Sequence, residues 1–200
     1  MESSKHYIST MPAAPFTLDE SKIIAGLMLE HGDRKEVRDI VHESNLLRVK
    51  SMDNESKIFN YVYNRLDTIP DQLKERLLSD DIVDSKFVNL ISIMAYDNLF
   101  REFVFEVYNG KRVYNDPITD YDIMSFFERV SQENDVVSSW KYETLFKLRR
   151  LYARILFEAG LLKNPTKVRE LSTPMVSLEL IDLLKRLGYA EYVGATVGFA

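Results

Sequence analysis

The sequence predicts an all-α protein of about eight to nine helices, and three observations lead to that prediction. Seven glycines and six prolines are few for 200 residues, and they fall between the periodic segments rather than inside them. Within those segments, apolar residues recur at i, i+3, i+4 and i+7. The apolar fraction of 46% can build a core. We therefore expect a compact multi-helix protein with helix-turn-helix or winged-helix-like units.

Composition also excludes several classes of protein. The chain has no cysteine, which excludes disulfides and thiolate chemistry and fits a reducing compartment. No apolar run approaches the roughly 18 to 20 residues that a membrane-spanning helix needs. The first residues lack the hydrophobic core of a signal peptide. We expect a soluble, cytoplasmic protein that does not enter a membrane.

Three segments are expected along the chain. Residues 1–16 read as a flexible tail, residues 17–110 as an N-terminal helical subdomain, and residues 117–200 as a C-terminal helical subdomain with a winged-helix-like segment. The boundary falls at the loop Asn115-Asp116-Pro117, which carries strong turn residues.

The N-terminal helices begin at recognisable caps. Residues 17–20 (Thr-Leu-Asp-Glu) have the form of a capping box, and Gly32 ends the helix that follows. Asp33 is expected to cap a second helix, and Ser51 or Asp53 a third. Three short helices with a glycine turn have the proportions of a helix-turn-helix unit.

The middle of the chain is expected to continue as helices. Pro70 is placed at the first position of a short fourth helix, and Asp84 or Ser85 opens a fifth. A sixth is expected over residues 98–108. An alternative for that segment is a β-hairpin turning at Asn109-Gly110, but its second arm would be short.

Two further helices have predicted caps near the C-terminus. Thr119 or Asp120 is expected to cap one helix. Ser172 or Thr173 is expected to cap the last, which Gly188 ends.

A cationic segment stands out in an otherwise acidic chain. Residues 138–162 read as one long helix, and from residue 138 to residue 170 eight basic residues face three acidic ones. This segment carries +5, whereas the whole chain carries −5. On a helical wheel, Lys147, Arg150 and Arg154 line the stripe opposite the apolar face. Either an anionic partner binds there, or i,i+4 pairs with glutamates simply solvate the helix.

Two further groups of residues are candidate contacts for a nucleic acid. Lys163 and Lys167 follow the long helix, where a winged helix would place its wing, and such residues serve phosphate contacts. The second group combines the basic residues Arg48, Lys50 and Lys57 with the amides Asn60 and Asn64, since asparagine can bind adenine in a bidentate way. An ordinary solvated helix face is the preferred interpretation of the second group. Arg65, beside the apolar positions, is expected to form a structural ion pair.

Signals of an enzyme are weak. His6, His31 and His42 have no ligand spacing, and there is no glycine-rich phosphate loop or nucleophile elbow. Glu55-Ser56-Lys57 has the Glu-x-Lys pattern of some nucleases, but it opens a helix rather than ending a strand. Asp116, Asp120 and Asp122 read as caps and solvated loops. We expect no catalysis, no metal, no cofactor and no small-molecule substrate.

The order and spacing of several short motifs resemble one protein family. They are Glu20-Ser21, Asn45-Leu46-Leu47, Arg65-Leu66, Asp97-Asn98-Leu99, Glu102-Phe103-Val104, Phe126-Phe127, and Trp140 and Thr144 leading into residues 156–162. Over about residues 17–193 the chain resembles the BrxA family of bacterial BREX phage-defence systems. It departs from the family pattern before Ser51, where Arg48-Val49-Lys50 stands in place of two adjacent basic residues. The resemblance implies an all-helical, NusB-like, non-enzymatic accessory protein that binds double-stranded DNA.

Three hypotheses follow for the function. The first is binding of duplex DNA, mainly through phosphates and with little sequence preference, by Lys147, Arg150, Arg154, Lys163, Lys167, Arg48, Lys50 and Lys57. The second is a protein-interaction adaptor that contacts other BREX proteins. The third is binding of RNA, by analogy with NusB-like proteins.

Overall fold

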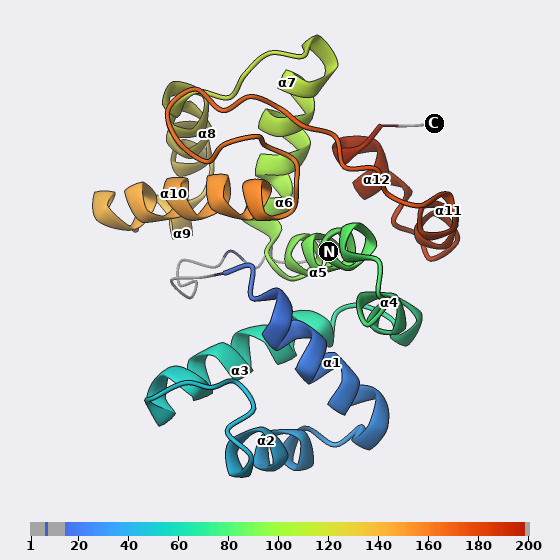
Figure 1. Cartoon of the computed structure of the whole chain (residues 1–200). Helices are drawn as coiled ribbons and strands as arrows, with labels where there is room; N and C mark the ends of the chain where they lie inside the picture. The colour runs from blue at the N-terminus through green and yellow to red at the C-terminus, as the bar shows by residue number, and fades with distance from the viewer. Residues whose placement is uncertain (1–6, 8–14, 199–200) are drawn as a thin grey trace, which may run out of the picture. The chain divides into compact units, whose positions relative to one another are not determined.

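The computed structural model describes residue 7 and residues 15–198, and these residues form twelve α-helices and one π-helical turn (Figure 1). The part of the chain that is described contains two isolated β-bridges and no longer strand. The all-α prediction is therefore confirmed, but the number of helices exceeds the expected eight to nine. The helix-turn-helix and winged-helix units stay predictions, as does the division at residues 110–117.

Contacts divide the chain into two units: a first unit of residues 12–96, and a second unit of residues 97–200 together with residues 1–11. The first unit contains α1 (Leu18–His31), α2 (Arg34–Glu43), α3 (Met52–Leu66), α4 (Asp71–Leu77) and α5 (Ile82–Tyr96). Helix α1 packs against α2, α3, α4 and α5, so it lies at the centre of this unit. Its buried residues include Ile24 and Ala25.

The start of α1 differs from the predicted capping box. Thr17 occupies the cap position with a left-handed backbone (φ 39°), and its side chain makes no capping hydrogen bond. Instead its Oγ1 accepts a hydrogen bond from Arg65 at 3.0 Å. The end of α1 and the start of α2 are as predicted: Gly32 has φ 73°, and Asp33 accepts from the Glu36 N–H at 3.0 Å. A tertiary contact has replaced the local cap at Thr17.

Arg65 lies fully buried in the first unit, and the prediction that it forms an ion pair is wrong. Its guanidinium donates to neutral oxygens only: the carbonyls of Pro15 and Phe16 at 2.7 and 2.9 Å, and the side chains of Thr17, Ser21 and Asn89. No carboxylate of the described residues lies within ion-pair distance of it. Burial lowers the pKa of the guanidinium, because a charge is costly away from water. The residue therefore ties the segment before α1 to α3 and α5.

Helix α4 starts one residue later than predicted, whereas the cap of α5 lies three to four residues earlier. Pro70 is the cap residue of α4 rather than its first helical residue. Helix α5 starts at Ile82, where Asp81 accepts from the Val83 N–H at 2.8 Å. Asp84, one of the two predicted caps, is buried and pairs with Arg76 at 3.2 Å.

The second unit contains α6 (Asn98–Phe103), η1 (Val104–Tyr108), α7 (Asn109–Tyr114), α8 (Asp120–Glu133), α9 (Asp135–Ser138), α10 (Tyr142–Glu158), α11 (Leu178–Arg186) and α12 (Ala190–Thr196). Helical structure is unbroken from α6 through η1 to α7. The prediction of a helix is therefore confirmed, and the alternative of a β-hairpin is wrong. The helical stretch passes straight through Asn109-Gly110, the proposed turn.

Helix α8 starts as predicted, whereas the prediction of a single helix over residues 138–162 is wrong. Thr119 and Asp122 form a capping box, with Thr119 N–H donating to the Asp122 carboxylate at 2.8 Å. A turn at residues 139–141 separates α9 from α10. There the hydroxyls of Ser138 and Ser139 donate to backbone carbonyls at 2.8 and 2.7 Å, and serine side chains that bond the backbone in this way compete with a continuing helix.

The last predicted cap is also wrong. Helix α11 is capped by Ser177, whose hydroxyl accepts from the Leu180 N–H at 3.2 Å, and not by Ser172 or Thr173. The Ser172 N–H instead donates to the Leu161 carbonyl at 2.9 Å, which holds this segment extended. Gly188 follows α11 with φ 89°, as expected.

An aromatic cluster positions α10 in the second unit. Tyr152 of α10 is buried, and its ring centroid lies 5.0 Å from Phe100, 5.3 Å from Phe103 and 5.5 Å from Phe127. Such contacts add to the burial of large apolar surfaces. The apolar face of α10 is thereby fixed against α6 and α8, and its opposite face points to solvent.

Candidate nucleic-acid interface

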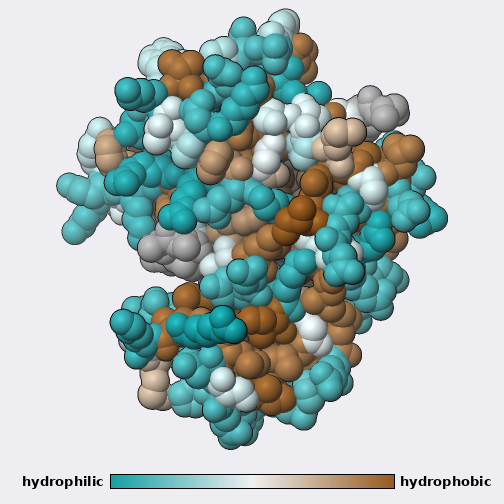
Figure 2. Space-filling model, viewed as in Figure 1, coloured by the Kyte–Doolittle hydropathy of each residue, from teal (hydrophilic) through white to brown (hydrophobic). Residues whose placement is uncertain are grey.

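Helix α10 displays the three predicted basic residues on its solvent side. Lys147, Arg150 and Arg154 are exposed, whereas Leu151 and Ile155 are buried. The visible face of the protein is mainly hydrophilic around α8 and α10 (Figure 2). The amphipathic pattern read from the sequence is therefore confirmed.

The ion pairs expected on this helix form only in part. Arg154 Nε pairs with Glu158 Oε1 at 2.6 Å, as its i,i+4 spacing predicts. Lys147 and Arg150, by contrast, form no ion pair with any described residue, although Glu143 lies four positions before Lys147. Two cations on this stripe are thus available to an external anion without breaking an internal contact.

Arg149 takes a different role from its neighbour Arg150. Its guanidinium lies over the ring of Phe146, 4.3 Å from the centroid, and pairs with Asp120 at 3.1 Å. Its side chain is mostly buried. The arginine therefore joins α10 to the start of α8 rather than facing solvent.

After α10 the chain forms a bridged loop, defined as residues 163–170. The Lys163 N–H donates to the Glu170 carbonyl at 2.9 Å, and their side chains pair at 3.1 Å. Arg169 and Ile118 exchange backbone hydrogen bonds of 2.9 and 3.0 Å. Lys167 is exposed near the tip with a left-handed backbone (φ 59°), and it has no ion pair among the described residues.

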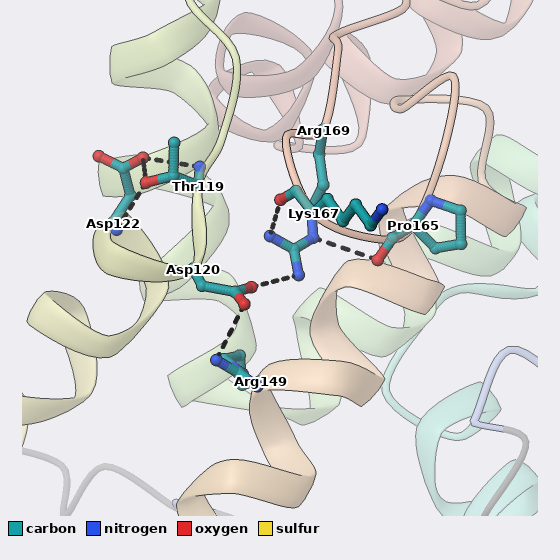
Figure 3. Close-up of polar contacts among 7 residues, drawn as sticks. All are labelled: Thr119, Asp120, Asp122, Arg149, Pro165, Lys167 and Arg169. Carbon is teal, nitrogen blue, oxygen red and sulfur yellow. Dashed lines mark hydrogen bonds and ion pairs between the residues drawn. The ribbon is translucent and has the colours of Figure 1, made fainter.

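Asp120 holds this loop beside α10 (Figure 3). Its Oδ1 accepts from Arg169 at 2.6 Å, and its Oδ2 pairs with Arg149 at 3.1 Å. Arg169 is almost fully buried and also donates to the carbonyls of Pro165 and Lys167 at 3.2 and 3.0 Å. One carboxylate thus joins α8, α10 and the tip of the loop.

The sequence does not predict this network, because Asp120 reads there as a cap or as part of a solvated loop. The signal available was Arg149, a charged residue on the apolar flank of an amphipathic helix. Such a residue needs a partner, but the sequence does not say which of the many acidic residues supplies it.

The remaining three candidates belong to the first unit. Arg48 is exposed in the turn between α2 and α3 with a left-handed backbone (φ 52°), and Lys50 follows it in an exposed position. Lys57 on α3 pairs with Asp53 at 2.5 Å, so Asp53 is an ion-pair partner rather than the cap. Ser51 occupies the cap position of α3 but makes no capping hydrogen bond.

The prediction that Asn60 and Asn64 read bases is not supported by their contacts. The side-chain oxygen of each accepts a hydrogen bond from Arg34, at 2.9 and 2.7 Å. Asn64 also donates to the Tyr96 hydroxyl at 3.4 Å. Bidentate recognition of adenine needs both the oxygen and the nitrogen of the amide, and the oxygen is already in use.

Histidines and acidic residues of the described part form no group of three that could hold a metal. His31 pairs with Glu36 at 3.0 Å and His42 with Glu55 at 2.9 Å. His6 lies outside the described residues. Among the residues described, no helix is both long enough and apolar enough to cross a membrane.

Comparisons with known proteins show the family. The family model of BrxA matches residues 5–188. The chain is 34% identical to the BREX protein BrxA of Bacillus cereus (strain H3081.97) over 199 residues, which cover 99% of this chain and all of that protein. It is 20% identical to the BREX protein BrxA of Escherichia coli O9:H4 (strain HS), over 99% of this chain and 93% of that protein.

A solved structure shares the fold. It is the crystal structure of an uncharacterized protein from Magnetospirillum magneticum, with a TM-score of 0.80 and 21% identity, covering 96% of this chain and 98% of that one. With a family model that matches nearly the whole chain and a full-length relative at 34% identity, the chain belongs to the BrxA family.

Proposed function

We propose that the protein is a non-enzymatic accessory factor of a BREX phage-defence system that binds duplex DNA mainly through phosphate groups, with little sequence preference. The names of its relatives support the BREX assignment. The observation that carries DNA binding is that Lys147 and Arg150 on α10 and Lys167 in the bridged loop are exposed and have no internal partner among the described residues. Phosphate contacts need charge and reach rather than a shaped pocket.

Arg154 and Lys163 extend this cationic surface. Each is already paired with a glutamate, but exposed ion pairs contribute only about 0–1 kcal/mol, so a phosphate can replace the carboxylate at little cost. Five phosphate contacts by these residues would give a slope of log affinity against log salt of about −4.5.

The bridged loop supports the same proposal. Its tip residue Lys167 is displayed by a loop whose shape is held by Arg169 and Asp120. We propose that the loop acts as a wing beside α10, so that helix and loop contact phosphates together. A preformed loop binds with a smaller loss of conformational entropy than a flexible one.

The amide contacts in the first unit support a low sequence preference. With the oxygens of Asn60 and Asn64 bound to Arg34, the groups best suited to reading bases are engaged. Arg48 and Lys50 remain exposed cations that can add phosphate contacts, with Lys57 as a third.

The test is a gel-shift titration over a range of salt concentrations with the full chain. The double variant Lys147→Glu/Arg150→Glu should lower the affinity for a duplex strongly and reduce the slope from about −4.5 to about −2.7, because two phosphate contacts are lost. The matched control is Lys35→Glu/Arg38→Glu on α2, which changes the net charge by the same amount at exposed positions.

Circular dichroism must first show that both variants are folded. If the α10 variant bound duplex as tightly as wild type, the proposal would be wrong. If both variants lost affinity equally, the effect would come from net charge and not from α10. Single-stranded RNA included as a competitor decides the RNA alternative, since stronger binding of RNA than of duplex would favour it.

A second candidate function is a protein-interaction adaptor within the BREX machinery. The observation that favours it is a groove with exposed aromatic residues in the second unit, whose charge is opposite to that of the α10 stripe. Association with other BREX proteins that survives nuclease treatment would support this function.

A further inference from the structure

A groove of about 490 Å³ lies in the second unit between α8 and the helical stretch formed by η1 and α7. Phe126 lines it from a buried position, whereas Tyr114 and Tyr121 line it with 78% and 79% of their surfaces exposed. Tyrosine is enriched at binding surfaces because its ring offers a large contact area with few torsions to fix. Two exposed tyrosines on one concave surface therefore indicate a place for a partner.

The wall formed by η1 and α7 is unusual in two respects. Val104–Tyr108 is a π-helical turn. Such turns are rare in proteins overall, and those that occur are often found at functional sites. Gly110, in the next turn, lies within a right-handed helix, where glycine is about 1 kcal/mol less favourable than alanine. A Cβ at Gly110 would meet no atom within 4 Å, so packing does not require glycine. Its effect is to leave this wall of the groove bare.

Both cations that line the groove are already held by carboxylates. Lys111 pairs with Asp122 at 2.9 Å. Arg129 pairs with Glu106 on one side and with Glu133, at 2.5 Å, on the other. An incoming anion would have to displace these internal pairs.

The balance of charge at the groove is negative. Three carboxylates line it, against two cations, which leaves a net charge of −1, and Glu133 beside the groove pairs with one of those cations. Asp116 lines the groove in an exposed position and forms no ion pair with a described residue. The groove therefore offers a cation one free carboxylate and two exposed aromatic rings.

Helix α8 separates this groove from the cationic surface of α10. At about 100° per residue, Arg129 lies about 180° around the helix from Asp120, and Ser125 about 140° from it. Asp120 contacts Arg149 and Arg169, whereas Ser125 and Arg129 line the groove. The two surfaces thus face different sides of one helix, and a ligand at one does not occupy the other.

We propose that the groove binds an arginine-bearing segment of a partner polypeptide. A guanidinium can lie flat against Tyr114 or Tyr121 and at the same time pair with Asp116, a combination that an ammonium or an anion does not match as well. The space in front of Gly110 admits the apolar stem of the side chain. The proposal concerns a protein partner and is independent of DNA binding by α10.

The test uses the full, isotope-labelled chain and a peptide probe, acetyl-Gly-Arg-Leu-Arg-Gly-amide, followed by amide chemical shifts. The control probe carries citrulline in place of both arginines, which keeps the shape and removes the charge. Shifts should concentrate at Gly110, Tyr114 and Tyr121, and the citrulline probe should bind at least about fivefold more weakly.

Variants then separate the groove from general attraction. Tyr121→Ala and Asp116→Asn should each weaken binding about three- to fivefold, the size of one exposed cation–π contact or ion pair. The matched control is Tyr142→Ala, which removes an exposed tyrosine from α10 and should leave the affinity unchanged.

Three results would overturn the proposal: equal binding of the citrulline probe, shifts spread evenly over acidic surfaces, or variants that bind as tightly as wild type.

Discussion

Replacing Asp120 with asparagine tests whether one carboxylate holds the bridged loop beside α10. The side chain is 49% exposed, and it accepts from Arg169, which is 5% exposed, and from Arg149. Hydrogen bonds to charged groups contribute about 1.5–3 kcal/mol each. Because water screens half of this carboxylate, we discount each contact to about 1 kcal/mol and expect a loss of about 2 kcal/mol for the pair.

The loss should be local, so the assay is amide hydrogen exchange by NMR. A change of about 2 kcal/mol corresponds to roughly 30-fold faster exchange, and it should appear at the Arg169 and Ile118 amides, which bridge the loop to the chain before α8. The control is Asp135→Asn. Asp135 is the first residue of α9, as Asp120 is of α8, so this variant repeats the change at the helix dipole without breaking an ion pair.

Exchange at Arg169 that rose less than threefold would refute the reasoning, as would an equal effect of the Asp135 control. The first result would mean that the backbone bridge alone holds the loop. The second would mean that the helix dipole, and not the ion pairs, accounts for the effect.

Three further outcomes are expected. Burial raises the pKa of Asp97 from 3.8 to about 7, so this carboxyl binds its proton more tightly in the folded state, and its contribution to stability falls as the pH rises from about 4 to about 7. Asp97→Asn keeps an acceptor for the cap of α6. Its free energy of unfolding in urea should therefore rise relative to that of wild type across this pH window, by about 4 kcal/mol at most. The same pH dependence in both proteins would contradict this. Arg65→Lys should lower the free energy of unfolding by at least about 3 kcal/mol in the same assay, because one ammonium cannot reach all the acceptors that two guanidinium nitrogens contact. A loss under about 1 kcal/mol would show that these hydrogen bonds are dispensable. Thr119→Ala should cost about 1 kcal/mol through loss of the capping box of α8, whereas Thr17→Ala should leave helix capping unaffected.

Local sequence signals predicted the existence of most helices and failed mainly at their ends. At Thr119 the side-chain hydrogen bonds go to Asp122 within the capping box, whereas the same pattern at Thr17 lost its cap to a buried arginine 48 positions away. Ser172 likewise does not cap a helix, because its backbone N–H donates to the Leu161 carbonyl. Propensity and caps act over a few residues, and a tertiary contact overrides them wherever it offers a better partner.

Prediction of the candidate site from sequence meets the same limit, because local signals do not reveal tertiary contacts. The exposed stripe of α10 follows from its 3.6-residue period, so Lys147, Arg150 and Arg154 could be placed from sequence alone. The Asp120 network could not, because its members come from segments up to 49 positions apart and their pairing depends on the fold. The proposed groove depends on two features without a sequence signal, a π-helical turn and a glycine whose surroundings are empty.

The buried Arg65 has a practical consequence for anyone who shortens or tags this chain. Two of its acceptors are the backbone carbonyls of Pro15 and Phe16, which no side-chain substitution can remove but a truncation can. A clone that starts at Leu18, the first residue of α1, would look reasonable from the helix boundaries, but it would leave this buried charge with only the side chains of Ser21 and Asn89 among its present acceptors. Expression vectors should therefore keep residue 15 and everything after it, with any cleavage site placed upstream.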